Sequence, residues 1–180
     1  SMSDIAQTAN ISKRTLYQLF EDKESLLVDG IDYRISRYQS LWEELEKGPY
    51  TVLDTILLFF REVMNHPKWC TQKFYDELKL FPKAVERDKM QNKQFEAKCL
   101  AVLNRGIEEG VFEKDQNYGI VVKLARQHLK LSYPSRAFSS YSNIEVYNTI
   151  LFAFLRGICT DKGRQILDRW FLSKKYHSIH

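Results

Sequence analysis

The chain has 180 residues, 44% of them hydrophobic and 28% charged, with a formal net charge of +4. This composition is ordinary for a globular protein, and because no stretch reaches the roughly 18 to 20 apolar residues of a membrane span, we expect no membrane partner. Cys70, Cys99 and Cys159 lie far apart without metal-ligand spacing, which favours a reducing, cytoplasmic location and no metal site. The positive charge permits an anionic partner without requiring one.

The first residues predict a short helix that ends in a tight turn. Ser1 and Asp4 have the spacing of a capping box, and a helix of about two turns should follow, with Ile5 and Ala6 on its buried face. Asn10 stands where the chain must turn sharply, because its side chain tolerates the positive φ for which glycine is the commoner choice.

A second short helix is predicted directly after this turn. Ser12 is its expected N-cap, and we expect Leu16, Leu19 and Phe20 to face inward. The polar side chains left on the outside are Lys13, Arg14, Thr15, Tyr17 and Gln18. Two short helices with a tight turn between them, the second with an exposed, donor-rich face, form the helix-turn-helix arrangement. This motif places its second helix in the major groove of DNA.

The exposed side chains of the second helix suit contacts with DNA. Lys13 and Arg14 can donate to O6 and N7 of guanine, and Thr15 can offer its methyl group to thymine or its hydroxyl to a base edge or a phosphate. Tyr17 and Gln18 can donate to phosphate oxygens.

A second phosphate contact is expected at the start of the next helix. Asp22 is its expected N-cap, which places Lys23 in a first turn where backbone N–H groups and an ammonium group both favour a phosphate. The predicted DNA-binding residues are therefore Ser12, Lys13, Arg14, Thr15, Tyr17, Gln18 and Lys23. A Lys-Arg pair also occurs on ordinary solvated helix faces, so the spacing alone leaves both interpretations open.

The segment DIAQTANISKRTLYQLFEDKESLL, residues 4–27, resembles the DNA-binding segment of the tetracycline-repressor (TetR) family. In that family Ile-Ala, a turn, Ser, a short polar run, Thr-Leu-Tyr, Phe, Lys and Leu-Leu recur in this order. The resemblance implies a homodimeric transcription regulator, usually a repressor, with a small DNA-binding head and a larger helical body that binds an effector. It also implies that Lys13, Arg14, Thr15 and Tyr17 face bases or nearby phosphates, and that Lys23 holds the DNA backbone.

Three features depart from the family pattern. Leu19 stands where the family often has a histidine or an aromatic residue that touches a phosphate, and Asn10 replaces the more frequent glycine. Family members also carry a whole helix before the one that begins near Ser1. We therefore expect that the sequence starts inside the domain, through truncation or loss of unobserved residues, and that a protein made from Ser1 onward has a loose head.

The rest of the chain predicts an all-α body. Glycine and proline fall between apolar stretches of period 3.6, which places helices over about 23–46, 50–65, 83–109 and 117–132, with another after Pro67. Asn143 is the expected cap of the next helix, and Asp161 is expected to open a short last one over about 162–172. We divide the chain into a DNA-binding head with its connecting helix, residues 1–46, and an effector-binding and dimerisation domain, residues 47–180.

The helix after Asn143 has two apolar faces, and two faces need two partners. We assign one face to the core of the chain and the other to the same helix of a second subunit, in a four-helix interface with the helix near 117–132. The predicted interface residues are Ile144, Tyr147, Leu151, Phe154 and Ile158. Burial within one large monomer is the alternative.

Aromatic residues gather in the middle helices and predict a pocket for a small apolar or aromatic effector. The candidate lining residues are Trp42, Phe59, Phe60, Met64, Trp69, Phe74, Phe95, Cys99 and His128. Aromatic residues at helical spacing also form plain core, and His128 fits a hydrogen-bonded core histidine. The effector would act by shifting the helix over 23–46 and so changing the separation of the two recognition helices.

The predicted function is a ligand-responsive transcriptional repressor that acts as a homodimer on a palindromic DNA operator. The sequence has no phosphate-binding glycine loop, no nucleophile elbow and no histidines at ligand spacing, so we predict neither an enzyme nor a cofactor. The alternative is a helical, dimeric interaction module whose DNA-binding head is incomplete or non-functional.

Overall fold

A computed structural model describes residues 1–65, 72–129 and 138–177, and confirms the all-α fold. The helices are α1 (Met2–Thr8), α2 (Lys13–Leu19), α3 (Lys23–Glu46), α4 (Val52–Asn65), α5 (Gln72–Leu78), α6 (Pro82–Glu108), α7 (Tyr118–Leu129), α8 (Asn143–Ile158) and α9 (Asp161–His177). Across these residues, extended pairing is limited to one isolated bridge, between Phe112 and Cys159. In the same residues, no helix has the length and apolar character needed to cross a membrane.

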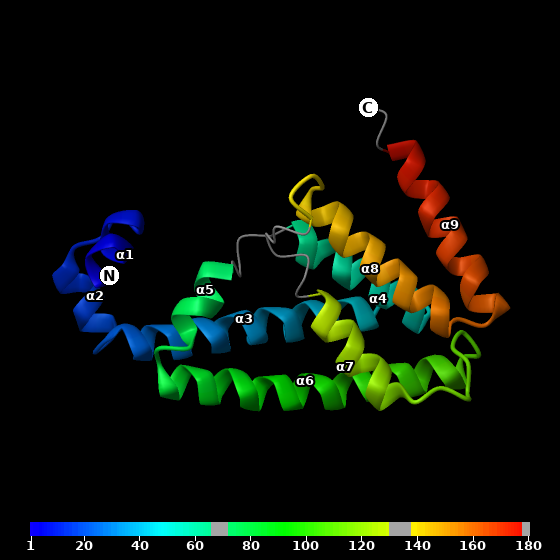
Figure 1. Cartoon of the computed structure of the whole chain (residues 1–180), viewed down its shortest axis with the longest axis horizontal. Helices are drawn as coiled ribbons and strands as arrows, with labels where there is room; N and C mark the ends of the chain where they lie inside the picture. Colours follow the sequence, from blue (N-terminus) through cyan, green and yellow to red (C-terminus); the bar gives the residue numbers. More distant parts are fainter. Residues whose placement is uncertain (66–71, 130–137, 178–180) are drawn as a thin grey trace.

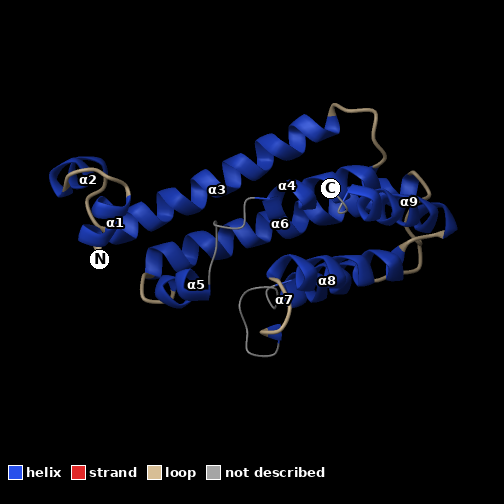
Figure 2. Cartoon of the chain, turned by 90° about the horizontal axis from the view of Figure 1, so that it is seen from above, coloured by secondary structure: helices blue, strands red, loops and turns tan. Residues whose placement is uncertain are grey.

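The two longest helices, α3 and α6, run side by side along the long axis of the molecule (Figure 1). We call α1 and α2 the head and α4–α9 the body. The head lies at one end of α3, and α4, α7, α8 and α9 gather at the other end, as the view from above also shows (Figure 2). The helix α3 therefore runs from the head into the body.

Buried apolar side chains form three separate clusters. The largest fills the body between α4, α6, α7, α8 and α9, and the head has its own small cluster of Met2, Ala6 and Leu16. The third, which we call the hinge cluster, consists of Leu27, Ile31, Leu78 and Ala84, with Val28, Phe74 and Phe81 packed against it. This cluster joins the start of α3 to α5 and to the first turn of α6.

A tight corner after α6 sets the direction of the body helices. Gly110 follows the end of α6 and has φ +71°, a conformation that glycine adopts at little cost. Phe112 is then buried against Gly106, where a Cβ atom would stand 2.2 Å from the phenyl ring. Only glycine at position 106 leaves room for this ring.

Two predicted helix ends differ from the structure. Ser142, and not Asn143, caps α8, because its side-chain oxygen accepts a hydrogen bond from the backbone N–H of Glu145 at 3.2 Å. The last helix is also longer than predicted, because α9 continues to His177. Either Ser or Asn can cap a helix, so the sequence alone did not decide between adjacent candidates.

Polar pairs line the contact between α3 and α6. Both carboxylate oxygens of Asp32 accept from the Arg87 guanidinium, at 2.6 and 2.9 Å, and Gln91 donates to Asp32 at 3.2 Å. The buried Arg34 donates to Asp88 at 3.3 Å. Polar pairs therefore supplement the hinge cluster in holding the connecting helix on the body.

Candidate nucleic-acid interface

The turn between α1 and α2 has the geometry that its sequence predicts. Asn10 adopts φ 54°, the N–H of Ile11 donates to the carbonyl of Ala6 at 3.0 Å, and the N–H of Asn10 donates to the carbonyl of Gln7 at 3.1 Å. These two bonds form a Schellman motif, which satisfies the last carbonyls of α1 while reversing the chain. The capping box of Ser1 and Asp4 at the other end of α1 is also confirmed.

The predicted cap of α2 is confirmed as well. Ser12 Oγ accepts from the backbone N–H of Thr15 at 3.0 Å and also bonds the Thr15 hydroxyl at 2.8 Å. The two hydroxyl groups are therefore engaged with each other at the helix start. The methyl group of Thr15 belongs to an exposed side chain and is not used by this bond.

One face of α2 is buried in the head and the opposite face is open. Leu16 lies in the head cluster, and at 100° per residue Arg14 and Gln18 stand on the side opposite to it. Tyr17, which is 53% exposed, lies on one side of this pair, and Thr15 lies on the other side of the pair. Neither Arg14 nor Lys13 forms an ion pair with any residue that the structure describes. The open face of α2 is thus rich in unengaged donors.

The inward orientation predicted for Leu19 is wrong. Leu19 is 66% exposed, whereas Leu16 is buried and Phe20 packs against the head cluster. Leu19 is the last residue of α2, and Phe20, on the other side of Leu16, takes the inward position in its place. Its apolar side chain extends the outer surface of the head.

The largest difference from expectation concerns Lys23. Asp22 caps α3 as predicted, through a capping box with Ser25, and the hydrogen bond from the Ser25 N–H lowers the pKa of the Asp22 carboxyl below its ordinary value. The Lys23 ammonium, however, pairs with Glu77 Oε2 on α5 at 2.5 Å and lies 5.5 Å from the centre of the Phe81 ring. In this conformation Lys23 points to the body and not to a surface shared with Arg14.

The candidate pocket residues do not all lie together in the structure. Tyr38 and Trp42 of α3 pack edge-on against Phe59, and Phe60 extends this chain of rings to Tyr147. Met64 and Cys99 pack on the same body core, and burial raises the pKa of the Cys99 thiol to about 12, so this thiol stays protonated. This part of the predicted set forms one continuous aromatic region.

Three other predicted pocket residues lie away from that region. Phe74 belongs to the hinge cluster, Phe95 is 37% exposed, and His128 is exposed, with its Nδ1 2.8 Å from the carbonyl of Leu124 and its ring beside Phe154. The core position considered for His128 is therefore wrong. Trp69 lies outside the described residues.

The predicted dimer residues of α8 divide between the inside and the outside of the chain. Tyr147, Leu151 and Ile158 are buried in the body core, so assigning them to a second subunit was wrong. The helical period shows two apolar faces but not which one the chain itself covers. Ile144 is 48% exposed, and the outer stripe of α8 consists of the small residues Thr149, Ala153 and Gly157.

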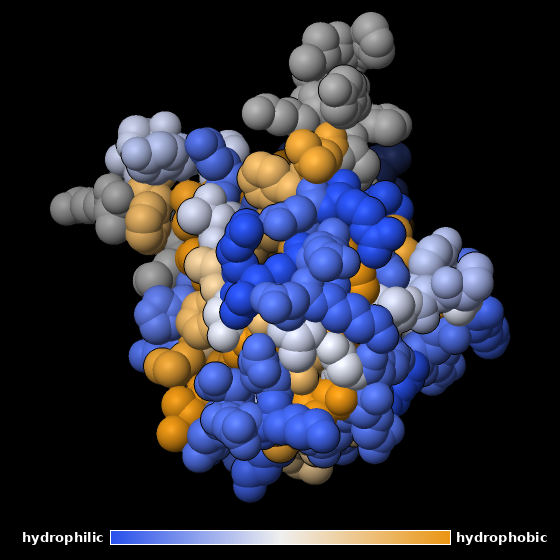
Figure 3. Space-filling model, turned by 90° about the vertical axis from the view of Figure 1, so that its right-hand side faces the viewer, coloured by the Kyte–Doolittle hydropathy of each residue, from blue (hydrophilic) through white to orange (hydrophobic). Residues whose placement is uncertain are grey.

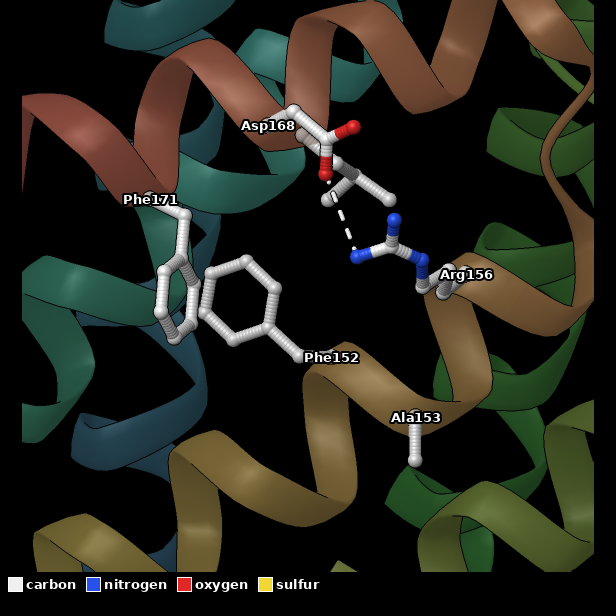
Figure 4. A pocket seen from close by; sticks show the side chains of 6 residues that line it. Phe152, Ala153, Arg156, Asp168 and Phe171 are labelled. Carbon is white, nitrogen blue, oxygen red and sulfur yellow. Dashed lines mark ion pairs between the residues drawn. The ribbon is translucent and has the colours of Figure 1, made fainter.

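A small pocket of about 130 Å³ lies between α8 and α9. Figure 4 shows the rings of Phe152 and Phe171 side by side and the ion pair of Arg156 with Asp168, 3.1 Å apart, while Ala153 points away from them. Ligand sites usually enclose roughly 300 to 1,000 Å³, so this pocket is too small for a drug-sized molecule. The end of the body farthest from the head is mostly hydrophilic, with smaller hydrophobic patches (Figure 3).

Comparison with known proteins finds a family likeness for this part of the chain. Residues 1–29 match the model of the bacterial regulatory proteins of the tetR family. Over these residues the chain is similar to the DNA-binding segment of the tetR family. The family match covers α1, α2 and the start of α3, the segment that carries the turn, the two caps and the open face of α2.

The body extends the likeness beyond the matched segment. The HTH-type transcriptional repressor KstR2 of Mycobacterium tuberculosis is 28% identical over 136 residues, which are 70% of this chain and 66% of that protein, slightly under two thirds of its length. KstR2 of Mycolicibacterium smegmatis is 25% identical over 132 residues, covering 70% of this chain and 64% of that protein.

Two solved structures share the fold. A TetR-family transcriptional regulator from Agrobacterium tumefaciens superposes with a TM-score of 0.72 at 16% identity, over 89% of this chain and 87% of the other. The ketosteroid transcriptional regulator KstR2 of Mycobacterium tuberculosis superposes with a TM-score of 0.64 at 23% identity, over 89% and 85% of the two chains. At these identities the superpositions establish the fold and no more.

Proposed function

We propose that this protein is a DNA-binding transcriptional repressor that acts as a homodimer on a palindromic operator and responds to a small apolar effector. In this proposal residues 1–46 read the DNA and residues 47–180 bind the effector and the second subunit. The observation that carries the proposal is the open face of α2, where Arg14 and Gln18 stand opposite the buried Leu16 and Lys13 and Arg14 have no described ion-pair partner. The tetR match and the repressor relatives support the same assignment.

Within this proposal Arg14 and Gln18 read bases at the centre of the interface. Arginine donates two hydrogen bonds to guanine O6 and N7, and glutamine pairs in the same way with adenine N6 and N7. Lys13, Tyr17 and the methyl of Thr15 contact neighbouring phosphates or thymine, and Ser12 holds the helix start in shape. Residues 1–27 carry three cations and four anions, so geometry and not net charge must direct the binding.

We infer that two copies pair through α7 and α8. The outer stripe of Thr149, Ala153 and Gly157 lets a second helix approach closely, since a Cβ atom added to Gly157 would meet nothing within 4 Å. On α7, which packs beside α8, Ile120 is 54% and Leu124 42% exposed. Two symmetric heads would then reach major-groove sites about 34 to 36 Å apart.

The effector proposal rests on the aromatic region of α3, α4 and α8. Edge-to-face rings from Trp42, Phe59 and Phe60 give an apolar environment suited to a flat, largely hydrocarbon ligand. One structural neighbour is a ketosteroid transcriptional regulator, which supports the same class of molecule for this chain. Because Tyr38 and Trp42 lie on α3, a ligand there would press directly on the helix that carries the head.

A gel shift with labelled DNA from upstream of the protein's own gene tests the proposal. We expect nanomolar binding that weakens steeply with salt, and Arg14→Ala should lose roughly 1 to 3 kcal/mol and relax the base preference. The matched control is Arg37→Ala on α3, which changes the same charge away from α2. A protein that forms dimers but binds neither this DNA nor duplexes selected from a random pool would instead support the interaction module.

A further inference from the structure

The first turn of α3 is held by the body through two charged side chains. Lys23 is only 23% exposed, and its ammonium is shared between the Glu77 carboxylate at 2.5 Å and the face of the Phe81 ring at 5.5 Å. The next residue, Glu24, accepts a hydrogen bond from the backbone N–H of Lys83 at 2.7 Å. A carboxylate is favoured at this place because the N–H groups of the first turn of α6 carry partial positive charge.

The hinge cluster lies directly beside these polar contacts. Leu27 and Ile31 of α3 pack with Leu78 of α5 and Ala84 of α6, next to Glu77 and Lys83 in the sequence. The position of α5 therefore fixes the position of the Glu77 carboxylate relative to Lys23. No comparable buried apolar cluster joins α1 or α2 to α5 among the described residues, so the charged contacts mark the boundary between head and body.

We propose that the Lys23–Glu77 pair is an autoinhibitory contact, in which the Glu77 carboxylate of the body competes with a DNA phosphate for the Lys23 ammonium. The inference rests on the proposed function, because it assumes that the head binds DNA. Lys23 stands at the N-terminus of α3, a helix of 24 residues that begins four positions after α2 ends. When it leaves Glu77, its ammonium is free to pair with the phosphate that the start of α3 would meet.

The proposal also assigns a role to α5. Phe74 lies one helical turn before Glu77 on the same short helix, and it packs into the hinge cluster. A ligand that holds α5 in the observed position keeps Lys23 engaged and weakens DNA binding, whereas a displacement of α5 releases Lys23. The two states differ in one charged contact available to DNA, so the expected change in affinity is modest.

The test is a double-mutant cycle on the full-length protein, measured by fluorescence anisotropy with a labelled duplex that the wild type selects from a random pool. Glu77→Gln should tighten DNA binding about two- to fivefold at low salt, the range expected for a partly exposed ion pair. Lys23→Gln should weaken binding and reduce the slope of log K against log salt by about 0.9. In the Lys23→Gln background, Glu77→Gln should have no further effect.

Asp76→Asn is the matched control, since it removes the same charge from the same helix at a carboxylate that pairs with Lys79 at 3.0 Å. It should leave the affinity within twofold of wild type, and thermal unfolding should confirm that all variants fold. An unchanged affinity for Glu77→Gln, or a gain that persists without Lys23, overturns the inference while the proposed function stands. A wild type that selects no duplex overturns the proposed function itself.

Discussion

The head and the body are stabilised by different kinds of interaction. The head buries only Met2, Ala6 and Leu16, yet each turn of its chain is closed by a side-chain cap or a Schellman motif. The body buries sixteen residues in one cluster that joins five helices. Local hydrogen bonds thus shape the head, whereas the free energy of the body comes mainly from apolar burial.

This difference bears on the separate roles proposed for the two regions. A region with few buried contacts opens locally at little cost in free energy, and such adaptability agrees with the DNA-binding role proposed for the head. The body provides the rigid frame against which α3 is held, by the hinge cluster and by the ion pairs to α6. The polar contacts along α3 therefore lie where the body meets the helix that carries the head.

The largest expected effect is a loss of stability in the body. Phe112→Ala should lower the free energy of unfolding of the body by about 3 to 5 kcal/mol, because it empties the space between Gly106 and the core. Urea unfolding followed by far-ultraviolet circular dichroism measures this loss. A loss below about 1 kcal/mol would contradict the central place of Phe112 in the core.

A smaller change is expected from the equivalent substitution in the head. Leu16→Ala removes the main buried side chain of α2 and should destabilise the head locally by about 2 to 3 kcal/mol while the unfolding midpoint of the body stays unchanged. Hydrogen exchange of the α1 and α2 amides should accelerate, with no change in α4 or α8. Equal acceleration in both regions would show that head and body unfold as one unit.

The smallest effect concerns the contact between α3 and the body. The Arg87 guanidinium, by hydrogen bonds and charge, holds the pKa of the Asp32 carboxyl below 3.8, its ordinary value. A lowered folded-state pKa contributes stability that is present above the unfolded value and is lost as the pH falls through the folded value. Because both side chains are about one third exposed, this contribution should be below about 1 kcal/mol.

Asp32→Asn tests this pH dependence. The wild type should lose thermal stability below about pH 4 more steeply than the variant, and the two curves should converge at the acid end, where Asp32 is protonated in both states. Asp54→Asn is the control, since Asp54 accepts hydrogen bonds from Thr51 at the start of α4 and not from α6. Parallel curves for Asp32→Asn and wild type would show that this pair does not stabilise the α3–α6 contact.

The sequence by itself determined the features that depend on near neighbours in the chain. The caps at Ser1, Ser12 and Asp22 and the positive φ of Asn10 all follow from a side chain that reaches backbone within three residues or from the backbone preference of one residue. The helical period was equally local, and it predicted α3 with its observed bounds. The tetR match covers this same locally encoded part.

Only the tertiary structure decided contacts between residues far apart in sequence. Lys23 meets Glu77 across 54 positions, and no local pattern distinguishes a lysine that faces a phosphate from one that faces a distant carboxylate. The same holds for α8, where periodicity revealed two apolar faces but packing chose the one that carries Tyr147, Leu151 and Ile158 for the core. Side-chain pairing across helices depends on how the helices are placed, and that placement results from burial summed over the whole chain.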